Sequence, residues 1–69
     1  MNDIQKAQQI ILLSKRDKTV TPQLEFCLTK MWYNLLVTNT LDHTWRNHMS
    51  EDCISKCRKY FNQKNITLK

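Results

Sequence analysis

Two histidines and two cysteines lie close together in the second half of the chain: His43, His48, Cys53 and Cys57. A structural zinc site needs four such ligands arranged as a tetrahedron. Cys53 and Cys57 are four residues apart and share one face of a helix, but His43 and His48 are five apart and point in different directions. We therefore expect no metal site. The cysteines are better explained as small core residues and the histidines as boundary groups.

A cysteine thiol is also a candidate nucleophile. Cys27 lies in the most apolar stretch of the chain, where burial raises the pKa of a thiol and makes it unreactive. Cys53 follows a potential helix start at Ser50, which favours a thiolate, but the neighbouring acids Glu51 and Asp52 oppose it. No base and orienting group can be assigned to either cysteine. The sequence predicts no catalytic residue, no cofactor and no enzyme activity.

The composition restricts the fold class. The chain has 69 residues and no glycine, where average usage would give about five. Without glycine, phosphate-binding loops of the P-loop or Rossmann kind are excluded and tight β-hairpins are disfavoured. A chain of this length forms one domain with a thin core. We expect a single all-α domain over residues 1–69, with a binding or regulatory role.

The compartment is predicted from the start of the chain and from the cysteine count. Met1, Asn2 and Asp3 do not resemble the basic region of a signal peptide, and no apolar run approaches the ~20 residues of a membrane span. Three cysteines, an odd number, fit reduced thiols better than a disulfide framework. We expect a cytoplasmic protein with reduced cysteines and no membrane segment.

The apolar periodicity predicts a bundle of three or four helices, at about 3–16, 22–38 and 41–62, with a frayed tail at 63–69. Thr21 and Pro22 are typical of a helix start, and Asn39 is a suitable left-handed cap at a helix end. Ser50 precedes two acidic residues, as at a helix N-terminus. The last helix therefore either wraps around its neighbours or breaks near Ser50.

The second helix is predicted to be central because it is apolar on two sides. Its main stripe consists of Leu24, Cys27, Leu28, Met31 and Leu35. A second apolar stripe lies on the opposite side of this helix. An apolar run at residues 10–13 cannot fit one face of the first helix. Together these side chains exceed what three short helices can bury. We therefore predict a protein-binding surface made of Leu12, Leu13, Phe26, Tyr33 and Val37, with Trp32 and Trp45 as core or anchor residues.

Nucleic-acid binding is the alternative, because the net charge is +5 at pH 7. The basic residues of the last predicted helix spread over about half of its circumference. A DNA-reading helix would concentrate them on one exposed face. A solvated surface is favoured over a DNA site by about two to one. The candidate residues for this alternative are Arg46, Lys56, Arg58 and Lys59.

One further pattern concerns the order of the tryptophans. A first helix containing Lys6, Ala7, Gln8 and Gln9 precedes a second helix carrying Trp32, and Trp45 is followed eight residues later by Cys53. In this order and spacing the chain resembles the AraC negative regulator family, small helical proteins of enteric bacteria and phages. Trp45 and Cys53 match the two ends of its Trp–x3–Arg–x3–Cys signature. Met49 stands where that signature has arginine, so no arginine contact is carried over.

The resemblance implies a cytoplasmic repressor of virulence transcription without catalytic activity. Members of the family bind AraC-type activators and block their self-association and hence their DNA binding; for some, a nucleoid protein is a further partner. By this resemblance the partner of the present chain is an AraC-type transcriptional activator. A homodimer formed through the same face and a DNA-binding or nucleoid-associated regulator remain the alternatives.

Overall fold

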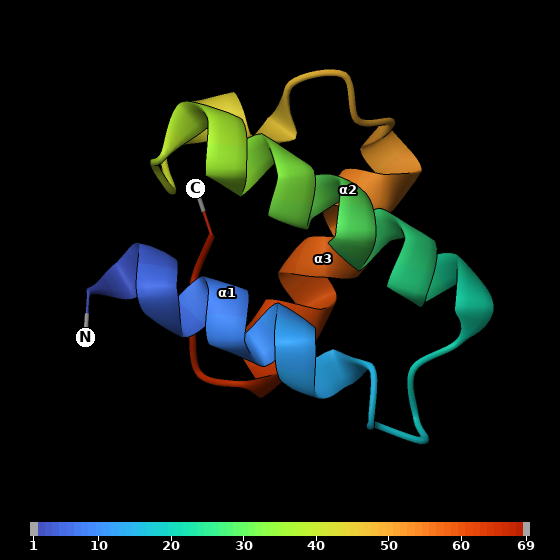
Figure 1. The fold of residues 1–69 in the computed structure, drawn as a ribbon. Helices are drawn as coiled ribbons and strands as arrows, with labels where there is room; N and C mark the ends of the chain where they lie inside the picture. The colour runs from blue at the N-terminus through green and yellow to red at the C-terminus, as the bar shows by residue number, and fades with distance from the viewer. Residues whose placement is uncertain (1, 69) are drawn as a thin grey trace.

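The computed structural model describes residues 2–68. It contains three α-helices and one short 3-10 helix within that range: α1 (Asp3–Ser14), α2 (Pro22–Thr38), η1 (His43–Arg46) and α3 (Glu51–Gln63). Helix α2 packs against α1, η1 and α3. In Figure 1, α1 and α2 lie toward the viewer and α3 crosses behind them. The predicted all-α bundle with a central second helix is confirmed.

Each α-helix begins at the cap that the sequence provides. The Asn2 side chain accepts a hydrogen bond from the Gln5 backbone N–H, and the Gln5 side chain accepts one from the Asn2 N–H in return. The Thr21 hydroxyl accepts from the Leu24 N–H at 3.1 Å, with Pro22 as the first helical residue. The Ser50 hydroxyl accepts from the Cys53 N–H. These caps satisfy N–H groups that have no partner inside the helix.

The helix ends differ in part from the prediction. Helix α1 stops at Ser14, whose hydroxyl donates to the Ile11 carbonyl at 2.5 Å, and does not continue to residue 16. Helix α2 ends as predicted, with Asn39 in the left-handed conformation at φ 53°. Of the two alternatives for residues 41–62, one wrapping helix or a break near Ser50, the structure shows the break. His48 has φ 61°, which no helical residue adopts, and Ser50 starts α3 anew.

The core lies between α2 and α3 and is closed by η1 and α1. Trp45 and Phe61 are the largest fully buried side chains, packed in one cluster with Leu28, Met31 and Leu35 of α2. The Asn34 amide donates to the carbonyls of Trp45, at 2.9 Å, and Asn47, at 2.7 Å. These two bonds fix η1 against α2.

The segment after α3 also contributes to the core. Leu68 is only 7% exposed, and Ile66 packs against the same cluster. The Ile66 N–H donates to the Phe61 carbonyl, which turns the chain back toward the core. The expectation of a frayed tail is therefore wrong for Ile66 and Leu68, since their apolar side chains gain more from burial than from solvation. Lys69 lies outside the described residues.

Candidate protein-binding surface

Helix α2 exposes an apolar stripe on the side away from α3. Phe26, Tyr33 and Val37 are 59%, 63% and 85% exposed. They follow one another at seven and four residues and so share one helix face. Large side chains that leave this much apolar area in water are rare as a contiguous set on small monomeric proteins. The periodicity places the same three residues on a second apolar side of the helix, and the structure exposes them; their role in binding stays a prediction.

Helix α1 adds to this surface through Leu12 but not through Leu13. Ile11 is buried in the core, so its neighbours in the apolar run at residues 10–13 point in other directions around the helix. Leu12 shares a cavity with Trp32 and Tyr33, whereas Leu13 lines a separate one with Tyr60 of α3. Leu13 is exposed, but it lies apart from the stripe on α2.

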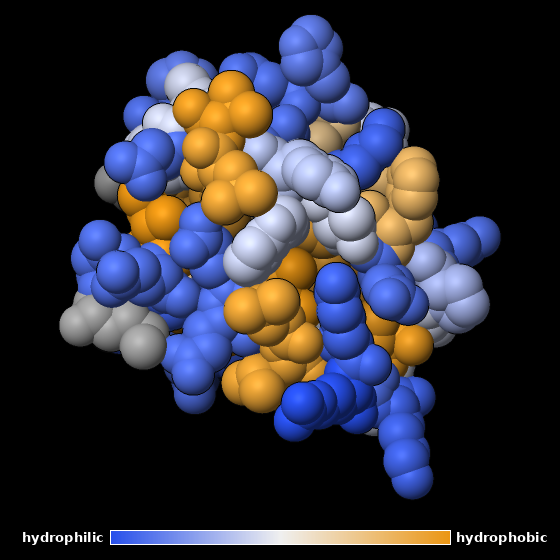
Figure 2. All heavy atoms as spheres, viewed as in Figure 1, coloured by the Kyte–Doolittle hydropathy of each residue, from blue (hydrophilic) through white to orange (hydrophobic). Residues whose placement is uncertain are grey.

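Leu36 also belongs to the surface, although it is not among the binding residues predicted from the sequence. It is 54% exposed and follows Trp32, which is half-buried, by one helical turn. A helical wheel places Leu36 beside the core stripe and does not show whether a neighbouring helix covers it. We name as the α1–α2 face the exposed apolar residues Leu12, Phe26, Tyr33, Leu36 and Val37, together with half-buried Trp32. Figure 2 shows apolar side chains running across the side formed by α1 and α2, bordered by hydrophilic ones.

Trp45 is not part of this face. Its relative exposure is 0%, and η1 holds it in the core beneath α2. Of the two alternatives left open for this residue, core or anchor, the structure supports core. A partner could reach Trp45 only after unfolding of η1.

A cavity of about 150 Å³ lies between the end of α1 and the middle of α2. Its lining is Ile11, Leu12, Lys15, Thr29, Trp32 and Tyr33. Ile11 is buried, Thr29 and Trp32 are half-buried, and the other lining residues are exposed. The cavity opens on the α1–α2 face and gives it a concave centre.

Basic side chains border the face. The Lys30 ammonium lies 5.2 Å from the centre of the Phe26 ring, a cation–π distance. Lys15 caps the end of α1 and lines the cavity. The carboxylate of Asp17, two residues after Lys15, accepts hydrogen bonds from Thr19 and Tyr60. The Thr19 hydroxyl and N–H are the main cause that lowers the pKa of Asp17 below its usual value.

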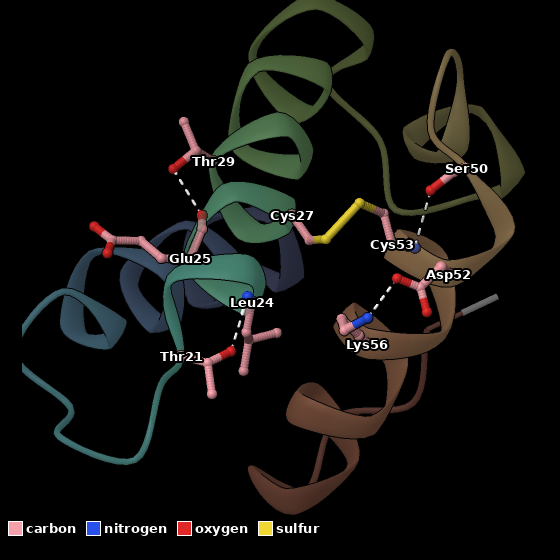
Figure 3. The surroundings of a disulfide bond; sticks show 9 residues. All are labelled: Thr21, Leu24, Glu25, Cys27, Thr29, Ser50, Asp52, Cys53 and Lys56. Atoms are coloured by element: carbon pink, nitrogen blue, oxygen red, sulfur yellow. Dashed lines mark hydrogen bonds and ion pairs between the residues drawn. A yellow bond between two sulfur atoms is a disulfide. The ribbon is translucent and has the colours of Figure 1, made fainter.

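A disulfide joins the other side of α2 to α3. Cys27 and Cys53 are bonded, with Cα atoms 5.1 Å apart and a sequence separation of 26. Figure 3 shows Cys27 pointing toward α3, while Glu25 and Thr29 project from the opposite side of α2. The expectation of three reduced thiols is wrong for these two. An odd count leaves one cysteine over, and Cys57 is that free and buried thiol.

None of the three cysteines is an exposed free thiol. Cys27 and Cys53 are paired, and burial raises the pKa of the Cys57 thiol to about 12. No three histidine, cysteine or acidic side chains among residues 2–68 are placed to hold a metal ion. Within the same range no helix has the length and apolar character to span a lipid bilayer.

The candidate nucleic-acid residues are divided over different parts of the surface. Arg46 belongs to η1, and half-buried Arg58 has its own interaction within the protein. Lys56 forms an ion pair with Asp52 one turn earlier in α3. Lys56 and Lys59 do line one cavity of about 280 Å³, together with Thr19, Thr21 and Tyr60. The structure thus brings two of the four together.

Comparisons with protein-family models, with curated proteins and with solved structures give no significant match to this chain.

Proposed function

We propose that this chain is a negative regulator of transcription that binds another protein through the α1–α2 face. The observation that carries the proposal is the exposure of Phe26, Tyr33 and Val37 on one side of the central helix. Burying such side chains against a partner is favourable by roughly 25 cal/mol per Å² of apolar area. Tyrosine and other aromatic residues are also common anchors of protein interfaces.

We further propose that the partner is an AraC-type activator and that binding blocks the activator's dimerisation and DNA binding. This part rests on the resemblance carried by Trp32, Trp45 and Cys53. In the present chain Trp45 is a core residue and Cys53 forms the disulfide, so both ends of the signature support the fold. The contacts with an activator would come from the α1–α2 face instead, by occupying an apolar helical seam of the activator.

The proposed site of action is the cytoplasm, where such an activator works. Disulfides are rare there because thioredoxin and glutathione keep thiols reduced. The disulfide is buried in the core, whereas the α1–α2 face is exposed. A repressor acting in this compartment must therefore keep that face folded when the Cys27–Cys53 bond is reduced.

The binding test uses purified AraC-type activators, with size-exclusion chromatography and light scattering to measure their oligomeric state. Added chain is expected to convert an activator dimer into a complex with one activator subunit. The variant Tyr33→Asp with Val37→Asp is expected to leave the dimer intact. Its control is Ser55→Asp with Asn62→Asp, which makes the same charge change at exposed positions of α3. Equal effects of both variants would contradict the assigned surface.

Direct DNA binding is the second candidate function. It is favoured by the net charge of +5 and by the neighbouring Lys56 and Lys59 at the cavity beside α3. Because Lys56 is already paired with Asp52, it would have to exchange that partner for a phosphate. This cost, and the separate positions of Arg46 and Arg58, make DNA the weaker candidate.

A further inference from the structure

The cavity of the α1–α2 face can hold one side chain of a partner. Its volume of about 150 Å³ equals that of apolar protein cavities that bind benzene. Ile11 and Trp32 supply apolar walls, and the exposed side chains of Leu12 and Tyr33 flank the opening. A phenylalanine or leucine entering here would be covered by both helices, as interface anchors usually are.

The charge around this cavity favours an acidic partner. Lys15 is the only charged residue in the lining of this cavity. The nearest acid in sequence, Asp17, accepts hydrogen bonds from Thr19 and Tyr60, and its carboxylate lies 3.9 Å from the Lys64 ammonium. Glu25 lies one turn before Thr29 on α2, while Lys15 makes no ion pair with any residue in the range 2–68. Lys30 adds a second positive charge beside Phe26.

The shape of the face favours a helix as the occupant. The stripe from Phe26 to Val37 is straight and about three turns long, and side chains of a second helix can interdigitate with it. No β-strand occurs within residues 2–68, so the chain offers no sheet edge for an added strand. The central cavity suits the single largest residue of such a helix.

We propose that the α1–α2 face binds an amphipathic helix that places one aromatic or leucine side chain in the cavity and carboxylates against Lys15 and Lys30. This inference rests on the proposed function and specifies the chemistry of the partner. The apolar stripe supplies the contact area, and the two lysines select acidic over basic helices. Charges at the rim of an interface act mainly on specificity and on the association rate.

The test uses three labelled helical peptides of about five turns, with binding to the full chain measured by fluorescence anisotropy. Two share the same leucine and phenylalanine stripe but carry either glutamates or lysines beside it; the third is the glutamate peptide with its phenylalanine replaced by alanine. At low salt the glutamate peptide is expected to bind about fivefold more tightly than the lysine peptide, the factor given by two exposed ion pairs of usual strength. Loss of the phenylalanine is expected to weaken binding further, at all salt concentrations.

The substitution Lys15→Glu is expected to remove this preference and to strengthen binding of the lysine peptide. Lys59→Glu makes the same charge change on α3, at a residue that is equally exposed, and should leave the preference in place. Equal binding of the two charged peptides, equal effects of the two substitutions, or no binding of any peptide would overturn the proposal. Preference for the glutamate peptide without any effect on activator dimers would contradict the proposed function alone.

Discussion

The Tyr60 hydroxyl donates a hydrogen bond of 3.1 Å to the Asp17 carboxylate, 43 residues away in sequence. This bond ties the turn after α1 to the last turns of α3, and Lys64 lies over the Tyr60 ring on the same side. The contact holds the end of α1 in place. Leu12 and Lys15 lie at that end, so Tyr60 stabilises the part of the α1–α2 face that α1 contributes.

Removing this hydroxyl is expected to destabilise the protein. Tyr60→Phe keeps the buried ring but leaves Asp17 without this donor, and we expect a loss of about 1 kcal/mol in the free energy of unfolding, measured in urea at neutral pH. Burial and the Asp17 hydrogen bond raise the pKa of Tyr60 to about 12, from 10.0. Because the folded-state pKa is the higher one, the stability that depends on neutral Tyr60 is present below pH 10 and is lost as the pH rises through 12. In the Tyr60→Phe variant this part of the loss of stability at alkaline pH should be absent. The same dependence of stability on alkaline pH in both proteins would contradict the assignment.

Reduction of the Cys27–Cys53 bond is expected to lower stability while keeping the fold. Chain entropy predicts a loss of about 3 to 4 kcal/mol for a loop of this length, which corresponds to a decrease in Tm of roughly 15 to 25 °C for a small domain. Reduction leaves the apolar side chains of the core cluster in place, among them Met31 and Phe61, so we expect helical circular dichroism at low temperature to persist. The doubly substituted Cys27→Ala, Cys53→Ala protein is the control for effects of the reductant. Complete loss of helicity on reduction would contradict the proposed action in the cytoplasm.

In this glycine-free chain other residues adopt the left-handed backbone conformation that glycine usually provides. One of them, Asn39, ends α2. Asn39→Ala places a Cβ group without a local hydrogen-bonding side chain in this conformation, at a cost of about 1 to 2 kcal/mol. Asn39→Gly should be close to neutral, because glycine adopts the conformation freely but has more entropy in the unfolded chain. Thermal unfolding of the two variants checks this. An alanine variant as stable as the glycine variant would show that α2 does not end through this residue's conformation.

Salt titration separates the two candidate functions. A DNA-binding protein loses about one log unit of affinity per log unit of salt for each phosphate that it neutralises. We expect no complex with random duplex DNA in gel shifts at physiological salt. At lower salt we expect no DNA binding that weakens steeply with added salt and is lost when Lys56→Gln and Lys59→Gln are combined. Tight, salt-steep binding lost in that variant would favour the DNA-binding function instead.

Local signals in the sequence were sufficient for most of the fold. Thr21 with Pro22, Ser50 and Asn39 act within one helical turn, and a propensity for capping is visible without any tertiary information. The sequence allows a break at Ser50 without requiring it, because the break depends on His48, whose left-handed conformation has no strong sequence signal. The burial of Leu68 has no local signal either, because it depends on a turn at Lys64 and Asn65 that brings the chain back to the core.

The candidate site was predictable where it follows from periodicity alone. The spacing of Phe26, Tyr33 and Val37 indicated a second apolar side of the helix, and that side is exposed. Tertiary packing decided the rest. The sequence could not show that Leu13 points away from the stripe, that Leu36 remains uncovered, or that Lys15 lies at a cavity formed by two helices. The pairing of Cys27 with Cys53 likewise depends on how α2 and α3 meet.

The central claim is that the α1–α2 face mediates repression, and a transcriptional reporter driven by an AraC-type activator tests it most directly. Wild-type chain and the Ser55→Asp, Asn62→Asp control are expected to repress the reporter. The Tyr33→Asp, Val37→Asp variant, shown by circular dichroism to keep its helices and present at equal abundance, is expected to repress it no longer. Undiminished repression by that folded variant would contradict the claim.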